Sequence, residues 1–149
     1  MDGYQSLTAL LESAWKELDR SDADRRDLCL DVVGDVLETG RLTQEDAERA
    51  VERLVTVALS ADGYAVQESA LHAVCTAATH HRLPYRVLEP LATGADRFGP
   101  LLLAYVLAIL GSTRDRAALP VVQRFLHHPH PEVRGEAADA VNEIQWRRQ

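Results

Sequence analysis

The sequence predicts an all-α fold, a solenoid of about four antiparallel helix pairs, and three observations lead to it. The 149 residues are 46% hydrophobic and 26% charged, an ordinary globular balance. Only 5% are aromatic, and Ala and Leu recur throughout, which favours helices over strands. No segment alternates with the period of a strand. We expect residues 1–149 to form one domain, with pairs at roughly 5–39, 43–80, 84–111 and 115–147.

The first helix pair is defined by an apolar face and two breaks. A first helix ending near Asp19 is predicted by apolar residues at i, i+3, i+4, i+7 and i+8 spacing. These residues are Leu7, Leu10, Leu11, Ala14, Trp15 and Leu18. Ser21-Asp22 is a cap-like break, and a second helix follows over 23–38, before Gly40.

The second pair begins at a capping signal. Thr43 with Asp46 three residues on resembles a capping box with a shorter acid, and it predicts a helix to about Leu59. Asp62-Gly63 is a turn dipeptide, so the fourth helix should cover residues 64–79.

Prolines mark the third and fourth pairs. A short helix opens at Leu83-Pro84, and Pro90 should kink or end it near Leu91. The remaining helices are predicted at about 98–110, 115–126 and 132–146. Pro120 is tolerable because it lies near the first turn of the seventh helix.

An internal repeat favours a solenoid over a bundle. Four apolar residues of the fourth helix match four of the eighth at an offset of 67 residues. The matched sets are Val66, Ala70, Ala73 and Val74, and Val133, Ala137, Ala140 and Val141. Ala104 and Leu107 lie midway, 34 residues beyond Ala70 and Ala73, so the repeat unit is about 33–34 residues, one helix pair.

Residues 118–141 resemble the HEAT-like repeat of phycobilisome-lyase type. In that family a first helix leads into a turn with Pro or Asp, then a Val-Arg pair and small Ala residues, as in Val133-Arg134 here. The fourth helix repeats the pattern with Gln67 where the family usually has Arg, and the other pairs match in outline only. The resemblance implies that the even-numbered helices line a concave binding surface.

An acidic stripe on the second helix is the first candidate for partner binding. Four acids at i+4 and i+3 spacing lie opposite its apolar face: Asp27, Asp31, Asp35 and Glu38. Residues 1–62 hold 15 acidic and 7 basic residues, net −8, and residues 63–149 hold 8 and 9, net +1. Such a surface favours a basic partner, and the alternative is a solvated face near Arg20, Arg25 and Arg26.

The other even helices supply the remaining candidates. These are Glu68 and His72 on the fourth helix, and Asp139, Asn142 and Trp146 on the eighth. His72 and Cys75 lie three residues apart, but a metal site needs further ligands, so ordinary partly buried residues are the favoured interpretation. The three histidines of the 127–130 turn lack helical ligand spacing, which favours a solvated turn over a metal site.

The sixth helix is apolar nearly all round, which predicts a buried position at the centre of the stack. The alternative is an exposed patch that includes Leu102, Tyr105, Val106 and Ile109.

Several functional classes are disfavoured by missing motifs and by charge. The chain has no Gly-rich phosphate loop, nucleophile elbow or His-Glu-x-x-His motif, so we expect no catalysis, cofactor or metal. A net charge of −7 argues against a nucleic-acid partner, and no apolar run reaches the roughly 20 residues that span a bilayer. Two isolated cysteines and an N-terminus without signal-peptide features predict a cytoplasmic protein. Lys16 is the only lysine, which is typical of a GC-rich bacterial coding sequence.

The leading hypothesis is a non-enzymatic module that binds a protein partner, basic in character, through the concave helix row. The alternative is an immunity protein or inhibitor that blocks a basic toxin, such as a nuclease, with its acidic N-terminal half. We expect a monomer or a weak dimer.

Overall fold

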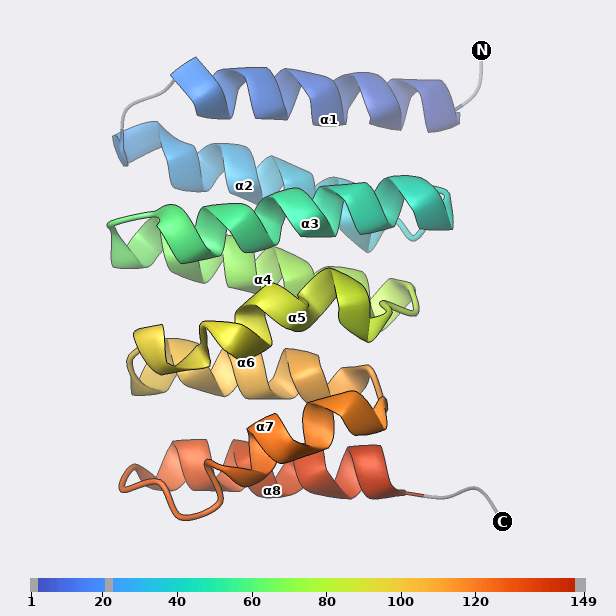
Figure 1. Cartoon of the computed structure of the whole chain (residues 1–149). Coiled ribbons are helices and arrows are strands. Elements are labelled where there is room, and N and C mark those ends of the chain that lie inside the picture. The colour runs from blue at the N-terminus through green and yellow to red at the C-terminus, as the bar shows by residue number, and fades with distance from the viewer. Residues whose placement is uncertain (1–2, 21–22, 147–149) are drawn as a thin grey trace. The chain divides into compact units, whose positions relative to one another are not determined.

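The computed structural model describes residues 3–20 and 23–146. Within these ranges the chain forms eight α-helices and two short 3₁₀ helices, with no strand (Figure 1). The prediction of an all-α fold is therefore confirmed. The chain divides into two compact units, residues 1–82 and residues 83–149, which are described in turn.

The first unit consists of two helix pairs. They are α1 (Gly3–Arg20) with α2 (Ala23–Glu38), and α3 (Gln44–Ser60) with α4 (Tyr64–His80). The most extensive packing in the unit is between α2 and α4, while α1 packs on α2 and α3 packs on α4. Fully buried aliphatic side chains fill the layer between these helices, among them Leu30, Val33, Leu37, Leu54, Val51 and Leu71. The two pairs are thus joined through their even-numbered helices.

Local signals explain where these helices begin and end. Gly40, which follows α2, has a φ of 67°, a left-handed conformation that glycine adopts without a steric penalty. The Thr43 hydroxyl accepts a hydrogen bond of 3.1 Å from the backbone N–H of Asp46, so the predicted cap of α3 is confirmed. The break predicted at Ser21-Asp22 lies outside the described residues.

The second unit repeats this arrangement with shorter first helices. Its elements are α5 (Tyr85–Thr93), η1 (Ala95–Arg97), α6 (Pro100–Ser112), η2 (Arg116–Ala118), α7 (Leu119–Gln123) and α8 (Pro131–Gln145). The even helices α6 and α8 again pack most extensively, with α5 on α6 and α7 on α8.

The predicted boundaries in this unit hold for α5 and fail for α7. Helix α5 ends at Thr93, two residues after the predicted Leu91, and Gly94 is its C-cap. The helix predicted over 115–126 is only five residues long in the structure. Pro120 has no N–H to donate to the carbonyl four residues earlier, so a 3₁₀ turn replaces the expected first turn. After Gln123 the backbone continues in turns with i to i−3 hydrogen bonds rather than in an α-helix.

The offset of 67 residues corresponds to a structural repeat. Ala70 in α4 and Ala137 in α8 are both completely buried. Their neighbours Ala73 and Ala140 each meet a glycine of the preceding even helix, Gly34 and Gly111 respectively. Small side chains therefore allow the even helices to approach closely in both units.

Gln67 and Arg134, also 67 residues apart, make corresponding hydrogen bonds. Gln67 donates from Nε2 to the carbonyl of Ala58 in the last turns of α3, at 3.0 Å. Arg134 donates from Nη1 to the carbonyls of His128 and Pro129, at 2.9 and 3.0 Å. In each case the second helix of a pair binds the backbone of the segment that precedes it.

Candidate interaction surface

The acids predicted on α2 form a continuous stripe on the outer side of the first unit. Asp31, Asp35 and Glu38 are exposed and Asp27 is half-buried. In the part of the chain that the structure describes, no basic side chain forms an ion pair with any of the four. These carboxylates, defined here as the α2 acidic stripe (Asp27, Asp31, Asp35 and Glu38), are therefore available to a positively charged partner.

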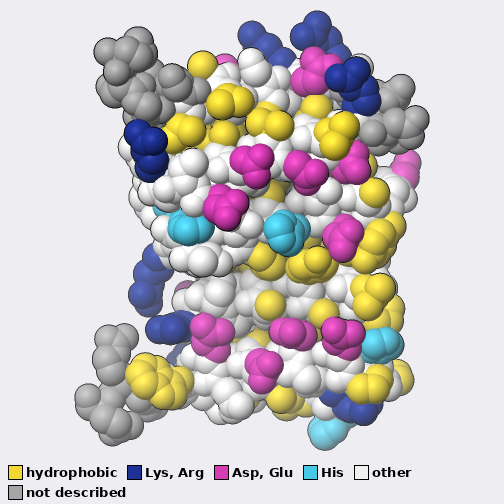
Figure 2. Space-filling view, turned by 180° about the vertical axis from the view of Figure 1, so that it is seen from behind, with side chains coloured by type: hydrophobic (Ala, Val, Ile, Leu, Met, Phe, Trp, Pro, Cys, Tyr) yellow, Lys and Arg dark blue, Asp and Glu magenta, His cyan; other side chains and the backbone are white. Residues whose placement is uncertain are grey.

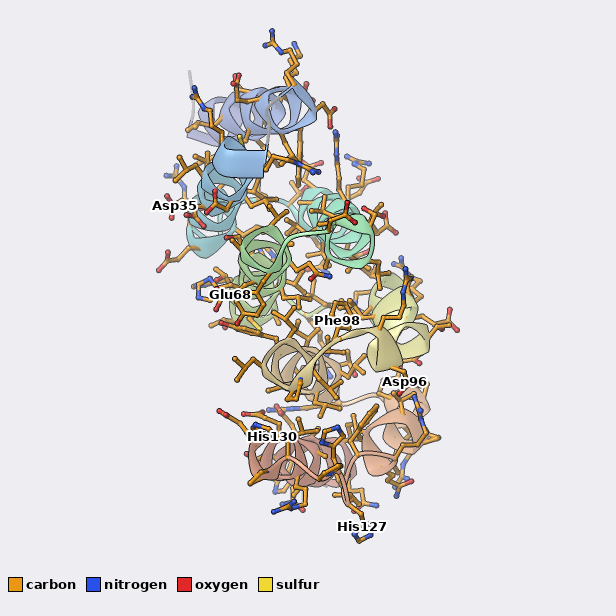
Figure 3. All side chains as sticks on the ribbon, turned by 90° about the vertical axis from the view of Figure 1, so that its left-hand side faces the viewer. Asp35, Glu68, Asp96, Phe98, His127 and His130 are labelled. Carbon is orange, nitrogen blue, oxygen red and sulfur yellow. The ribbon has the colours of Figure 1, made fainter. Side chains whose placement is uncertain are left out.

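The candidates on α4 lie on the same side of the first unit. Asp35 and Glu68 project in the same direction from neighbouring helices (Figure 3), and acidic and histidine side chains gather over α2 and α4 (Figure 2). Glu68 is half-buried and His72 is exposed, and both take part in further side-chain interactions. The structure thus brings together the candidates from the two even helices of this unit.

The candidates on α8 belong to the second unit. Asp139 and Asn142 are exposed, and Trp146, the C-cap of α8, is 61% exposed. Glu143 belongs to the same predicted surface of the eighth helix, whereas Glu132 and Glu136 were not predicted to contribute to it. Glu132, Glu136 and Glu143 share a face with Asp139 at spacings of four, three and four residues, and acidic side chains gather there in Figure 2. The net charge of +1 over residues 63–149 concealed this stripe, because arginines on other elements offset it.

These four residues, defined here as the α8 acidic stripe (Glu132, Glu136, Asp139 and Glu143), are close enough along the helix for their negative charges to repel one another. Partial burial raises the pKa of Glu136, and the negative charges of Asp139 and Glu132 raise it further. Glu143 has a counter-ion, since its Oε2 lies 3.5 Å from Nε of Arg114. A cationic partner would relieve the repulsion around Glu136.

The histidines of the 127–130 turn have a structural role. His128 accepts a hydrogen bond at Nδ1 from the backbone N–H of His130, at 3.1 Å. His130 accepts one at Nδ1 from the N–H of Glu132, at 3.2 Å, and so caps α8. The prediction of a simply solvated turn is therefore wrong for His128 and His130, and His127 alone of the three is exposed. Among the described residues, no three His, Cys, Asp or Glu side chains are grouped so that they could hold a metal.

Helix α6 is a core helix, as its composition predicts. Leu102, Val106 and Ile109 are buried and Tyr105 is half-buried, so the alternative of an exposed patch at these residues is wrong. The exposed side of α6 carries Leu101, which is 56% exposed, and Ala108.

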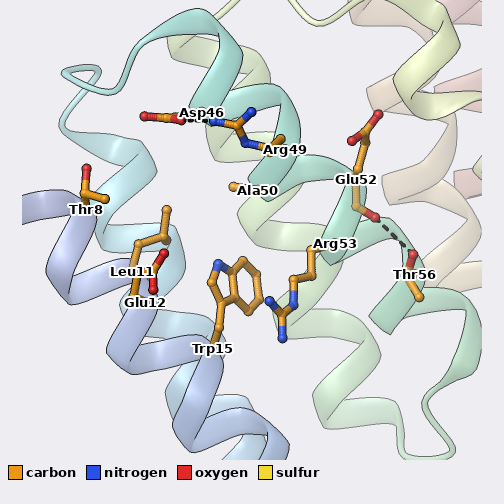
Figure 4. Close-up of a pocket in the computed structure, with 10 residues that line it drawn as sticks. All are labelled: Thr8, Leu11, Glu12, Trp15, Asp46, Arg49, Ala50, Glu52, Arg53 and Thr56. Carbon is orange, nitrogen blue, oxygen red and sulfur yellow. Dashed lines mark hydrogen bonds and ion pairs between the residues drawn. The ribbon is translucent and has the colours of Figure 1, made fainter.

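A pocket of about 640 Å³ lies between α1 and α3 in the first unit (Figure 4). Trp15, Leu11 and Ala50 supply its apolar wall. Its two arginines are engaged within the protein. Arg53 lies over the Trp15 ring at 4.7 Å and binds Asp19 at 3.0 Å, and Arg49 binds Asp46 at 2.6 Å. Because both arginines are paired with carboxylates, and Glu12 and Glu52 also line the pocket, it is poorly suited to an anionic ligand.

Comparison with solved structures shows which fold this chain shares. The chain is similar to two engineered proteins from the Northeast Structural Genomics Consortium, each with a TM-score of 0.65, at 18% and 17% identity. It is also similar to a designed armadillo repeat protein, with a TM-score of 0.59 and 15% identity. These matches cover 90%, 96% and 95% of this chain, which spans 62%, 40% and 69% of the respective proteins. The fold is therefore that of a helical-repeat protein, an α-solenoid.

No protein-family model matches the sequence, and no curated protein matches it either. Among the described residues, no helix has the length and apolar character needed to cross a membrane.

Proposed function

We propose that this chain is a non-enzymatic protein-interaction module that binds a basic segment of another protein through its even-numbered helices. The proposal includes two further points: residues 118–141 form a HEAT-like repeat, and the even-numbered helices line a concave surface. Helical-repeat architecture supports it, since stacked helix pairs present extended surfaces to partners.

The α2 acidic stripe is the observation that carries this proposal. Like charges at i, i+4 destabilise a helix by roughly 0.2–0.5 kcal/mol per pair, so helix stability alone does not account for Asp27, Asp31 and Asp35. Their exposure and the absence of a described counter-ion make them suited to steering and holding a cationic surface.

A capture experiment with the full chain tests the proposal. Wild-type protein and an Asp31→Lys, Asp35→Lys variant are immobilised, and bound proteins are identified by mass spectrometry. We expect a basic protein that the variant loses, with an affinity at least about tenfold weaker. Glu52→Lys with Asp62→Lys is the matched control, since it makes the same charge change in the first unit away from α2. Equal binding by both variants would remove the role assigned to α2.

The alternative, an inhibitor or immunity protein against a basic toxin, is supported by the charge difference between residues 1–62 and 63–149. It requires one tight partner whose active site is occluded. Its affinity should fall steeply with salt, because the Debye length shortens from about 10 Å at 0.1 M to about 3 Å at 1 M. An affinity that is nearly constant over this range would argue against it.

A further inference from the structure

An apolar groove runs between α1 and α2 in the first unit. It has a volume of about 380 Å³, and its floor includes Ala14, Cys29 and Val32. Leu10 of α1 and Leu28 of α2 line it while remaining 48% and 59% exposed. The sequence places Leu10 on the apolar face of its helix, yet the structure leaves about half of this side chain accessible.

The groove adjoins the α2 acidic stripe. Asp35 lies seven residues after Leu28, so the two share nearly one line along the helix, about 10.5 Å apart. Asp31 lies beside that line, one turn after Leu28. Hydrophobic side chains lie directly beside acidic ones on this side of the first unit in Figure 2.

On the α1 side of the groove, an exposed leucine is again followed by an acid seven residues later. Glu17 lies seven residues after Leu10 and also lines the groove, with Arg25 as the basic residue at that end. Each helix thus presents an exposed leucine and, two turns later, a carboxylate. The α1–α2 groove thus has an apolar floor and is lined by one acid, Glu17, and one base, Arg25, while Asp31 and Asp35 lie farther along α2.

We propose that the α1–α2 groove binds an amphipathic helix of the partner protein, with aliphatic side chains in the groove and Lys or Arg side chains against Asp31 and Asp35. A third helix fits a groove between two helices because ridges of side chains pack into it along its length. Its anchors at i, i+3, i+4 and i+7 would meet the apolar floor, and charge complementarity selects a basic flank over an acidic one. This inference rests on the proposed function and names the chemistry of the partner.

The test uses a panel of synthetic helical peptides of roughly 18 residues, with leucines on one face and lysines on its flanks. Binding to the full chain is measured by fluorescence anisotropy, and the site is mapped by the methyl NMR signals of the leucines. We expect the signals of Leu10 and Leu28 to shift and that of Leu101 to stay in place. Control peptides replace either the leucines with alanine or the lysines with glutamine, and each should bind at least about tenfold more weakly.

Variants of the protein separate the groove from the acidic stripe. Leu10→Gln with Leu28→Gln should weaken peptide binding about tenfold or more, since both side chains are already exposed and the core is untouched. Leu101→Gln is the matched control, because it removes an equally exposed leucine from α6, which does not line the groove.

Three results would overturn the inference. The first is that the Leu10→Gln, Leu28→Gln variant binds the peptides with wild-type affinity while an Asp31→Asn, Asp35→Asn variant does not bind them. This result would exclude the groove and leave the proposed function intact. Another is the absence of binding by every peptide of the panel up to about 1 mM. The third is self-association of the wild-type chain in sedimentation that Leu28→Gln abolishes, which would assign the groove to a second copy of this chain.

Discussion

Gly111 of α6 lies so close to Ala140 of α8 that a Cβ on Gly111 would be 2.9 Å from both Cα and Cβ of Ala140. Because one of these contacts is with backbone, the neighbour cannot move aside by a side-chain rotation. The corresponding contact in the first unit is looser, since a Cβ on Gly34 would lie 3.6 Å from Cβ of Ala73. Ala73 and Ala140 occupy equivalent positions of the repeat, but only Ala73 leaves room for a side chain larger than glycine on the facing helix.

Gly111→Ala should destabilise the protein, while Gly34→Ala should not. At Gly111 the helices must separate, and overpacking of about 1–3 kcal/mol exceeds the gain of about 1 kcal/mol from replacing a helical glycine. At Gly34 the contact is ordinary, so we expect a gain of about 0.5–1 kcal/mol. Urea unfolding of both variants measures the difference, and the same sign of change at the two positions would contradict it.

Ala70→Leu and Ala137→Leu should each cost roughly 1–3 kcal/mol, because both alanines are completely buried at equivalent points of the repeat. Ala61→Leu, at the half-buried C-cap of α3, is the control and should cost little. Thermal melting of the three variants checks this. Small and equal losses at Ala70 and Ala137 would mean that the alignment reflects a common Ala-rich pattern rather than a repeat.

Arg134→Ala should cost about 1–2 kcal/mol, and Gln67→Ala about 0.5–1.5 kcal/mol, through the loss of hydrogen bonds to the preceding segment. The larger effect falls on Arg134 because its guanidinium is charged and donates to two carbonyls. Arg97→Ala, at an exposed arginine of η1, serves as the control and should stay within about 0.5 kcal/mol of wild type. An equal loss at Arg97 would show that charge, rather than the hydrogen bonds, is responsible.

Glu136→Gln should stabilise the protein near pH 7 and have little effect in acid. Partial burial and the charges of Asp139 and Glu132 raise the pKa of Glu136 above its ordinary value of 4.5. The folded state therefore favours the protonated carboxyl, and its contribution to stability is present below pH 4.5 and lost as the pH rises through the raised pKa. Melting temperatures from pH 3 to 8 should converge for the two proteins on the acid side.

The pKa of Glu136 can also be followed directly by NMR titration of its carboxyl carbon. Asp139→Asn should lower it, since this change removes one of the two neighbouring negative charges. A pKa that does not respond to Asp139→Asn would leave burial and the charge of Glu132 as the causes of the shift.

Local spacing in the sequence was sufficient for most of the helical architecture. The Ser21-Asp22 break and Gly40 placed α2 at its observed bounds, and Thr43 marked the start of α3, because such signals act within a few residues. The seventh helix was predicted too long because only such local signals were used. Whether a helix continues past Gln123 depends on packing and turn geometry that a local pattern does not contain.

The sequence by itself determined most of the helices, the repeat and the burial of Ala70 and Ala137, since i, i+3 and i+4 spacing encodes the apolar face of a helix. Only the tertiary structure decided which polar and apolar residues share a surface. It placed Asp35 and Glu68 on one side of the first unit and left Leu10 and Leu28 exposed around one groove. The physical reason is that such surfaces are formed by side chains from different helices, and their proximity depends on how those helices pack.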